Sequence, residues 1–366
     1  MRDTLIKQRI WSNRTAYEKS RRKKYLQSKH LRIHGATVSQ NYDWKLRREI
    51  VVAPEIMDFN EHREVTLEFA KICRTNSLVR RKRSLLNFAK TTKISSPAML
   101  FLVAEIDRCR RIGGAALVNG TYPKDKNLSR QMQASGFYDA LGVKSDVTEQ
   151  EKSFPLEYIK VMSANQADGR LARELRQKLL GPLEANLAKD AKSSFFRGLS
   201  EAMTNVSQHA YPDDWSPDKI KPLRKTWWML GHINKLRKEL KVMIVDQGIG
   251  IPRSLPRAHT KERIKELLSL LSVIDPTDGQ MIRAAMEVGR SRLDETNRGK
   301  GLNDLKQIID VCGAGTLRIL SNKGEYRYTN NKNEKMQSYN DSLNGTLIEW
   351  SIPLKAILPF IADEQI

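Results

Sequence analysis

The sequence has few cysteines and no long hydrophobic run, and each absence excludes a class of protein. Its 3 cysteines among 366 residues have no C-x-x-C spacing, which argues against a disulfide framework or a structural zinc site and favours a reducing compartment. The apolar run at 98–104 is far shorter than the ~20 residues of a membrane-spanning helix. The first residues contain no apolar segment typical of a secretory signal. We therefore expect a soluble, cytoplasmic protein with no membrane contact.

Acidic residues are scarce relative to basic ones. The 64 Lys and Arg against 42 Asp and Glu give a net charge of +22 at pH 7, and residues 1–50 hold 14 basic against four acidic residues. We expect residues 1–45 to form a basic arm. Its core at 19–29 has aromatic neighbours, so contact with nucleic acid through residues 1–34 is one interpretation. A solvated tail, or contact with an acidic protein, is the alternative.

The apolar share of 40% excludes a wholly disordered chain, and the length suggests two domains or one large one. Residues 46–150 alternate between short apolar runs and helical patterns. We expect strands at 50–52, 84–88 and 115–118, and helices at 97–112 and 128–141. This order predicts a small α/β domain with a partly parallel sheet.

The turn at 94–97 resembles, weakly, the phosphorylated turn of STAS domains in anti-sigma-factor antagonists. It keeps two serines, Ser95 and Ser96, but lacks the acidic residue and the glycine of that family. The resemblance implies a STAS-like fold for this segment. For Ser96 itself we favour a helix N-cap, with Pro97 at the first helical position, over a phosphorylation site.

Three polar side chains recur at every fourth position within residues 195–211. Glu201, Asn205 and His209 would form one polar stripe on a helix. The amide of Asn205 offers a neutral oxygen to Mg²⁺, and Glu201 can orient or deprotonate a nucleophile. An amphipathic helix with a polar outer face is the alternative.

A glycine-rich turn follows a predicted buried strand at 242–245. Asp246 ends this strand, and Gly248 and Gly250 come directly after it. Glycines permit backbone angles closed to other residues and let a flat ligand approach the chain. Alone, the pattern is also typical of an ordinary turn.

A second glycine-rich segment precedes a predicted helix. Arg298, Gly299, Lys300 and Gly301 run into this helix near Leu302. Backbone N–H groups at such a helix start favour a phosphate, and Lys300 adds a mobile positive charge. A tight loop before an amphipathic helix is the alternative.

The last segment is a glycine turn, Gly345 and Thr346, that leads into a terminal strand. Residues 315–320 are its expected strand partner, and residues 321–342 read as a polar, Asn-rich excursion between the two.

Together, the order and spacing of these four segments resemble the GHKL ATPases, which include gyrase, the ninety-kilodalton heat-shock chaperone, histidine kinases and MutL. The resemblance implies an α/β (α+β) sandwich with a mixed, largely antiparallel sheet in a domain at 151–366, and the cofactors ATP and Mg²⁺. It also implies that Asp246 reads the adenine amino group, that Asn205 holds the metal, and that a lid covers the phosphates. In this chain the lid, expected at 253–298, departs from the pattern by its length and by a helical portion expected at 260–273. Glu201 and Lys300 are then the expected catalytic residues. The expected nucleotide-binding residues are Asn205, His209, Asp246, Gly248, Gly250, Arg298, Gly299, Gly301, Leu302 and Thr346.

Within this family, residues 200–212 most resemble the anti-sigma-factor serine kinases, in which the Glu is proposed to activate the acceptor hydroxyl. Three functions stay open. The first is a nucleotide-gated ATPase that acts as a switch on a protein partner or within a homodimer. The second is a serine kinase acting on a STAS-type partner or on Ser95 or Ser96, and the third is a nucleotide-stabilised module that binds nucleic acid.

Overall fold

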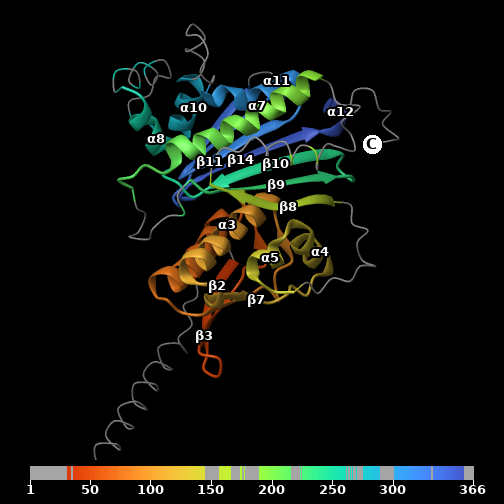
Figure 1. Ribbon diagram of the computed structural model, residues 1–366, viewed down its shortest axis with the longest axis vertical. Helices are drawn as coiled ribbons and strands as arrows, with labels where there is room; N and C mark the ends of the chain where they lie inside the picture. Colours follow the sequence, from red (N-terminus) through yellow and green to blue (C-terminus); the bar gives the residue numbers. More distant parts are fainter. Residues whose placement is uncertain are drawn as a thin grey trace, which may run out of the picture.

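The computed structural model describes residues 31–33, 36–144, 156–165, 189–215, 225–260, 275–288, 301–330 and 333–357, together with a few single positions between these ranges. The described chain mixes helices and strands in two units, each built on its own sheet (Figure 1). The predicted α/β (α+β) fold class is confirmed.

The amino-terminal unit contains a five-stranded sheet in the order β1-β2-β3-β5-β7. Its strands are β1 (Leu31–Ile33), β2 (Ala36–Asp43), β3 (Arg48–Val52), β5 (Ser84–Asn87) and β7 (Val118–Gly120). The β3–β5 and β5–β7 pairings are parallel, whereas β1–β2 and β2–β3 are antiparallel. The predicted partly parallel sheet is therefore confirmed. Two short strands, β4 (Ile56–Met57) and β6 (Lys93–Ile94), form a separate parallel pair.

The helices of this unit differ from the sequence prediction in two places. They are α2 (Arg63–Arg74), which continues as a π-helical turn, η1 (Thr75–Val79), then α3 (Ser96–Gly113), α4 (Lys126–Ser135) and α5 (Phe137–Leu141). The single helix expected at 128–141 is wrong because Gly136, with a φ of +81°, ends α4. The strand expected at 115–118 is also wrong, since Ala115–Leu117 forms a 3₁₀ turn and the strand begins only at Val118.

The start of α3 also differs. Ser95, not Ser96, occupies the N-cap position, and its side chain makes no capping hydrogen bond. Ser96 is already helical, and its hydroxyl forms a 2.8 Å hydrogen bond with Nε2 of His232 in the carboxy-terminal unit. The hydroxyl of Ser96 thus connects the two units instead of capping its own helix.

The carboxy-terminal unit contains a seven-stranded sheet in the order β13-β12-β11-β14-β10-β9-β8, and its described pairings are antiparallel. Its strands are β8 (Leu156–Ala164), β9 (Trp227–Asn234), β10 (Glu239–Asp246), β11 (Thr316–Ser321), β12 (Gly324–Thr329), β13 (Asn333–Ser338) and β14 (Thr346–Pro353). The predicted pairing of 315–320 with the terminal strand is confirmed. The polar excursion expected at 321–342 is wrong, because it contains β12 and β13; Tyr326 and Tyr328 on β12 are buried in the core.

Helices cover both faces of this sheet (Figure 1). One face carries α7 (Lys189–Asn205), α8 (Ile251–Ala258), α10 (Asp278–Val288) and α11 (Asp304–Cys312), and the other carries α3 of the amino-terminal unit. Alternate residues of β10 divide between the two cores: Val242 and Ile244 pack on the α7 side, whereas Met243 and Val245 pack on the α3 side. The amino-terminal unit and the sheet therefore share one hydrophobic core.

Part of the predicted lid at 253–298 is packed structure. The helix α10 lies against β12 and α8, and its Ile282, Ala284 and Met286 are buried. Residues 278–288 thus belong to the layer that covers the sheet. Residues 289–298 lie outside the described residues, as does most of the expected helical portion at 260–273.

Residues 1–30 of the predicted basic arm also lie outside the described residues, whereas its later part forms β1 and β2, and β2 pairs with β3. Within the described part of the chain, no helix combines the length and the apolar character required to cross a membrane.

Candidate functional site

Three of the four predicted motif segments meet on the α7 face of the seven-stranded sheet. Asp246 and Thr346 are direct partners in the pairing of β10 with β14. Alternate side chains of a strand face the same side of a sheet, and Val242, Ile244 and Ile348 pack on the α7 side. Asp246 and Thr346 stand at the positions of this alternation that face the same side. The carboxylate at 246 therefore lies on the face covered by the helix that carries Glu201 and Asn205.

The Asp246 carboxylate is buried and accepts backbone N–H groups. Gly248 donates to its Oδ1 at 2.7 Å, and Thr346 donates a second backbone hydrogen bond. Burial disfavours the charged form and raises the pKa of Asp246 to about 7 despite these two donors. Among the described residues, no Lys or Arg forms an ion pair with it. A buried carboxylate without a cation is costly, so its presence at the end of a central strand requires an explanation.

The turn after Asp246 is held against the end of α7. The backbone N–H of Ile249 donates to the carbonyl of Ala210 at 2.8 Å, and a Cβ added to Gly248 would lie only 2.3 Å from the same oxygen. Gly250 has a φ of +79°, a conformation that side chains rarely adopt. Position 248 therefore requires glycine because of the close approach to Ala210, and position 250 requires it because of the positive φ.

Two residues that sequence reasoning missed also support the turn. The Ser321 hydroxyl accepts the N–H of Ile251 at 2.8 Å and shares a 2.9 Å hydrogen bond with the Thr346 hydroxyl. Asn322 donates from Nδ2 to the carbonyl of Ile249 at 2.7 Å. Both serve as structural supports at the end of β11. Because residues 321–342 were predicted as a polar, Asn-rich excursion, no signal in the sequence identified them.

Glu201 and Asn205 form a polar pair one helical turn apart. Asn205 donates from Nδ2 to Oε1 of Glu201 at 3.0 Å and to its backbone carbonyl at 3.1 Å. Burial raises the pKa of Glu201, and the negative charge of Asp304 raises it further. Asp304, another residue that sequence reasoning did not single out, begins α11, so the start of this helix lies close to Glu201.

His209 lies beyond the α-helical part of the predicted stripe. The helix α7 changes at Val206–Ala210 to π-helical hydrogen bonding, in which each turn contains an additional residue. His209 is exposed, whereas Glu201 and Asn205 are half-buried. A one-residue irregularity of this kind leaves no pattern in the sequence.

The second glycine segment is only partly described. Arg298, Gly299 and Lys300 lie outside the described residues. Gly301 and Leu302 belong to a short 3₁₀ turn, Gly301–Asn303, directly before α11, and Leu302 packs against the helical core. The helix α11 contacts α7 along its length. The described end of this segment thus lies beside the helix that carries Glu201.

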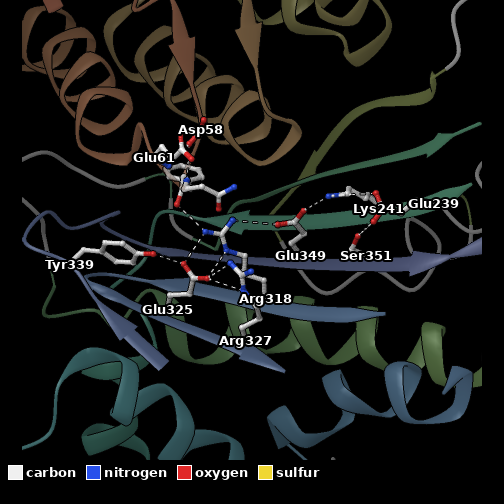
Figure 2. A network of polar contacts seen from close by, with 12 residues as sticks. Asp58, Glu61, Glu239, Lys241, Arg318, Glu325, Arg327, Tyr339, Glu349 and Ser351 are labelled. Carbon is white, nitrogen blue, oxygen red and sulfur yellow. Dashed lines mark hydrogen bonds and ion pairs between the residues drawn. The ribbon is translucent and has the colours of Figure 1, made fainter. Parts of the chain in front are cut away.

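The opposite face of the sheet carries a different polar cluster, which Figure 2 shows at the contact between the two units. Arg318 forms a bidentate pair with Glu325 at 3.0 and 2.9 Å and donates to the backbone carbonyl of Phe59 at 2.9 Å. Arg327 and Tyr339 also contact Glu325. The exposed fraction of both Arg318 and Glu325 is below 10%. This cluster holds the units together and lies on the face away from Asp246.

Neither a protein-family model nor a curated protein matches this sequence. The assignment of a function therefore depends on the geometry of the site.

Proposed function

We propose that this protein binds Mg–ATP on the α7 face of its carboxy-terminal sheet and acts as a nucleotide-gated ATPase of the GHKL type. The observation that carries the proposal is the buried Asp246 carboxylate, which lacks a described cation and lies on the same face as Glu201 and Asn205. An exocyclic amino group of a purine would add a further donor to this carboxylate beside its two backbone donors.

The amide of Asn205 fits a magnesium ligand. Its Nδ2 donates to Glu201, which leaves the amide oxygen as the candidate ligand atom. No group of three or more His, Cys, Asp or Glu that suits a metal occurs among the described residues. A Mg²⁺ ion here would therefore take few protein ligands and most of its oxygens from phosphates and water, which is its usual preference. When bound, the ion would neutralise charge on the transferring phosphoryl group.

Glu201 is suited to act on the attacking nucleophile. Its raised pKa makes it a better proton acceptor than an ordinary carboxylate, and Asn205 fixes its orientation. We assign to Glu201 the removal of a proton from the attacking water or hydroxyl group. Arg298, Gly299 and Lys300 lie outside the described residues, and their assignment to the phosphates rests on the sequence.

The serine-kinase alternative uses the same residues. In the structure, however, Ser95 and Ser96 begin α3, on the face of the sheet opposite Glu201. Ser95 is half-buried and Ser96 is bonded to His232. Transfer to either serine within the closed molecule would require the units to separate, so a kinase reaction would take its acceptor hydroxyl from another protein.

Incubation of the full chain with γ-labelled ATP and Mg²⁺ tests the proposal. Release of labelled phosphate that Glu201→Gln abolishes supports the ATPase. Label on a serine of an added protein favours the kinase instead. ATP binding without either reaction would favour the third alternative, in which the nucleotide is structural and residues 1–34 contact nucleic acid, and absence of binding would contradict all three.

A further inference from the structure

The residue after Asp246 connects the candidate nucleotide site to the amino-terminal unit. Gln247 is buried, with 2% of its surface exposed. Its Nε2 donates to Oε1 of Glu105 on α3 at 3.0 Å, and its Oε1 accepts from Nη1 of Arg108 at 3.4 Å. The side chain of Gln247 therefore points into the other unit while the preceding residue faces α7.

Glu105 is in turn held by a second helix. Arg74, the last residue of α2, donates from Nη1 to Oε1 of Glu105 at 3.2 Å. Glu105 and Arg108 are 1% and 3% exposed, so the cluster is closed to water. Polar groups in such a setting depend on one another, because a lost partner is not replaced by solvent.

The backbone of Gln247 is fixed from the opposite side. Its N–H donates to the Tyr211 hydroxyl at 2.9 Å, and this hydroxyl donates to the carbonyl of Thr226 at 2.8 Å. Tyr211 directly follows Ala210, whose carbonyl holds Ile249. Gln247 thus contacts Tyr211, which follows the helical segment after α7, through its backbone, and it contacts α3 through its side chain. A shift of the 246–250 turn would therefore disturb one of these contacts.

We propose that Glu105 is a positioning residue for the 246–250 turn, and that the Glu105–Gln247 bond couples nucleotide binding at Asp246 to the seating of α2 and α3 on the sheet. This inference rests on the proposed function, since the effector is the nucleotide itself. A ligand that fixes the turn fixes Gln247 and, with it, the buried cluster. By reciprocity, a firmly seated amino-terminal unit strengthens nucleotide binding by the same factor.

The two ends of the bond allow a test that separates coupling from a direct effect. Glu105→Met and Gln247→Met each remove the hydrogen bond at similar volume, and Glu105 itself lies on α3 and reaches the turn through Gln247. Each variant is expected to weaken binding of a non-hydrolysable Mg–ATP analogue by about 5- to 150-fold. The affinity of the double variant for the analogue is expected to be no lower than that of the weaker-binding single variant, because both substitutions remove the same hydrogen bond.

Asp107→Asn provides the matched control. Asp107 lies on the same helix and accepts from Trp228 Nε1 at 2.8 Å across the same interface, but within the described part of the chain it forms no hydrogen bond or ion pair with the 246–250 turn. The inference predicts unchanged analogue affinity in this variant. Equal weakening by Asp107→Asn and Glu105→Met would overturn the inference, as would wild-type affinity in Glu105→Met.

If Glu105→Met does not fold, amide hydrogen exchange of the wild-type chain with and without the analogue tests the coupling instead. The analogue is expected to slow exchange of amides at 105–109 on α3, which lie across the sheet from Asp246. Binding without any change in their exchange would overturn the coupling and leave the proposed function intact. A wild-type chain that binds no analogue would instead contradict the proposed function.

Discussion

Asp246 and Thr346 lie opposite one another at the ends of β10 and β14, and the backbone N–H of Thr346 donates to the Asp246 carboxylate. This relationship joins two segments that are distant in the sequence. It also fixes the carboxylate on the face of the sheet that α7 covers. Burial on that face raises the pKa of Asp246 and lowers the free energy of unfolding when the carboxylate is ionised.

The first prediction concerns the stability cost of Asp246. Because the pKa of Asp246 is about 7 in the folded protein and the ordinary value of an aspartate is 3.8, the folded state binds the proton more tightly than the unfolded state. Ionisation therefore lowers the free energy of unfolding as pH rises from about 4 to about 7. Asp246→Asn is expected to raise the stability of the nucleotide-free chain above pH 7, by up to about 4 kcal/mol, and to have little effect near pH 4. Urea denaturation at pH 5 and pH 8 would measure the difference, and a larger gain at pH 5 would contradict this account.

The same titration predicts pH-dependent binding. An ionised carboxylate accepts a purine amino group more strongly than a protonated one. Below its pKa of about 7, the affinity for Mg–ATP should fall by up to about tenfold for each pH unit. Calorimetry at pH 6, 7 and 8 would show this slope in the wild type. A flat profile would mean that Asp246 does not contact the ligand in its ionised form.

The third prediction separates binding from turnover at Glu201. Glu201→Gln keeps the shape of the side chain and removes its ability to accept a proton, so phosphate release should fall by about 10²- to 10⁴-fold while the affinity for Mg–ATP is retained. Asp190→Asn, at an exposed position in the first turn of the same helix, is the control and should retain both. Equal loss of binding and turnover in Glu201→Gln would show that Glu201 is structural.

The fourth prediction contrasts two glycines. A Cβ at Gly248 would lie 2.3 Å from the Ala210 carbonyl oxygen, whereas a Cβ at Gly198 inside α7 would lie 3.6 Å from its nearest neighbours. Gly248→Ala must displace the turn and should abolish nucleotide binding. Gly198→Ala should leave binding intact and raise stability by about 0.4–1 kcal/mol. Thermal denaturation and calorimetry of both variants would test this contrast, which fails if Gly248→Ala binds as the wild type does.

The fifth prediction concerns the contact between the units. Arg318 and Arg327 both bind Glu325, but the side chain of Arg318 is 9% exposed and that of Arg327 is 42% exposed. Arg318→Met leaves Glu325 with less of its buried charge compensated and should lower the free energy of unfolding by about 3–5 kcal/mol. Arg327→Met should cost at most about 1 kcal/mol. Similar losses from the two variants in urea denaturation would contradict the assigned role of burial.

Local patterns in the sequence were sufficient for most of the central elements. A buried apolar run predicted β10, and the helical spacing of apolar residues predicted α3. The glycine turn at 345–346 predicted β14, with residues 315–320 (β11) as its partner. At 321–342 the sequence predicts a polar excursion, whereas polar and aromatic residues there form the strands β12 and β13. Side chains of this kind become strand residues only when a neighbouring strand and a covering helix bury them.

The sequence indicated candidate site residues only where the local backbone restricts the residue type at a position. Asp246 and its glycines stood out because a turn with such close approach restricts the residue type. The partners Ser321, Asn322 and Gln247 could not be predicted, since their roles arise from contacts between segments far apart in the chain. The π-helical turn at Val206–Ala210 was not predicted either, and its last residue holds the N–H of Ile249.

Calorimetric titration of the full chain with a non-hydrolysable Mg–ATP analogue at pH 8 tests the central claim most directly, with Asp246→Asn and Asp107→Asn measured in parallel. The account predicts saturable binding by the wild type and by Asp107→Asn, and a loss of binding in a folded Asp246→Asn. Equal affinity in all three proteins, or no binding by the wild type, would contradict it.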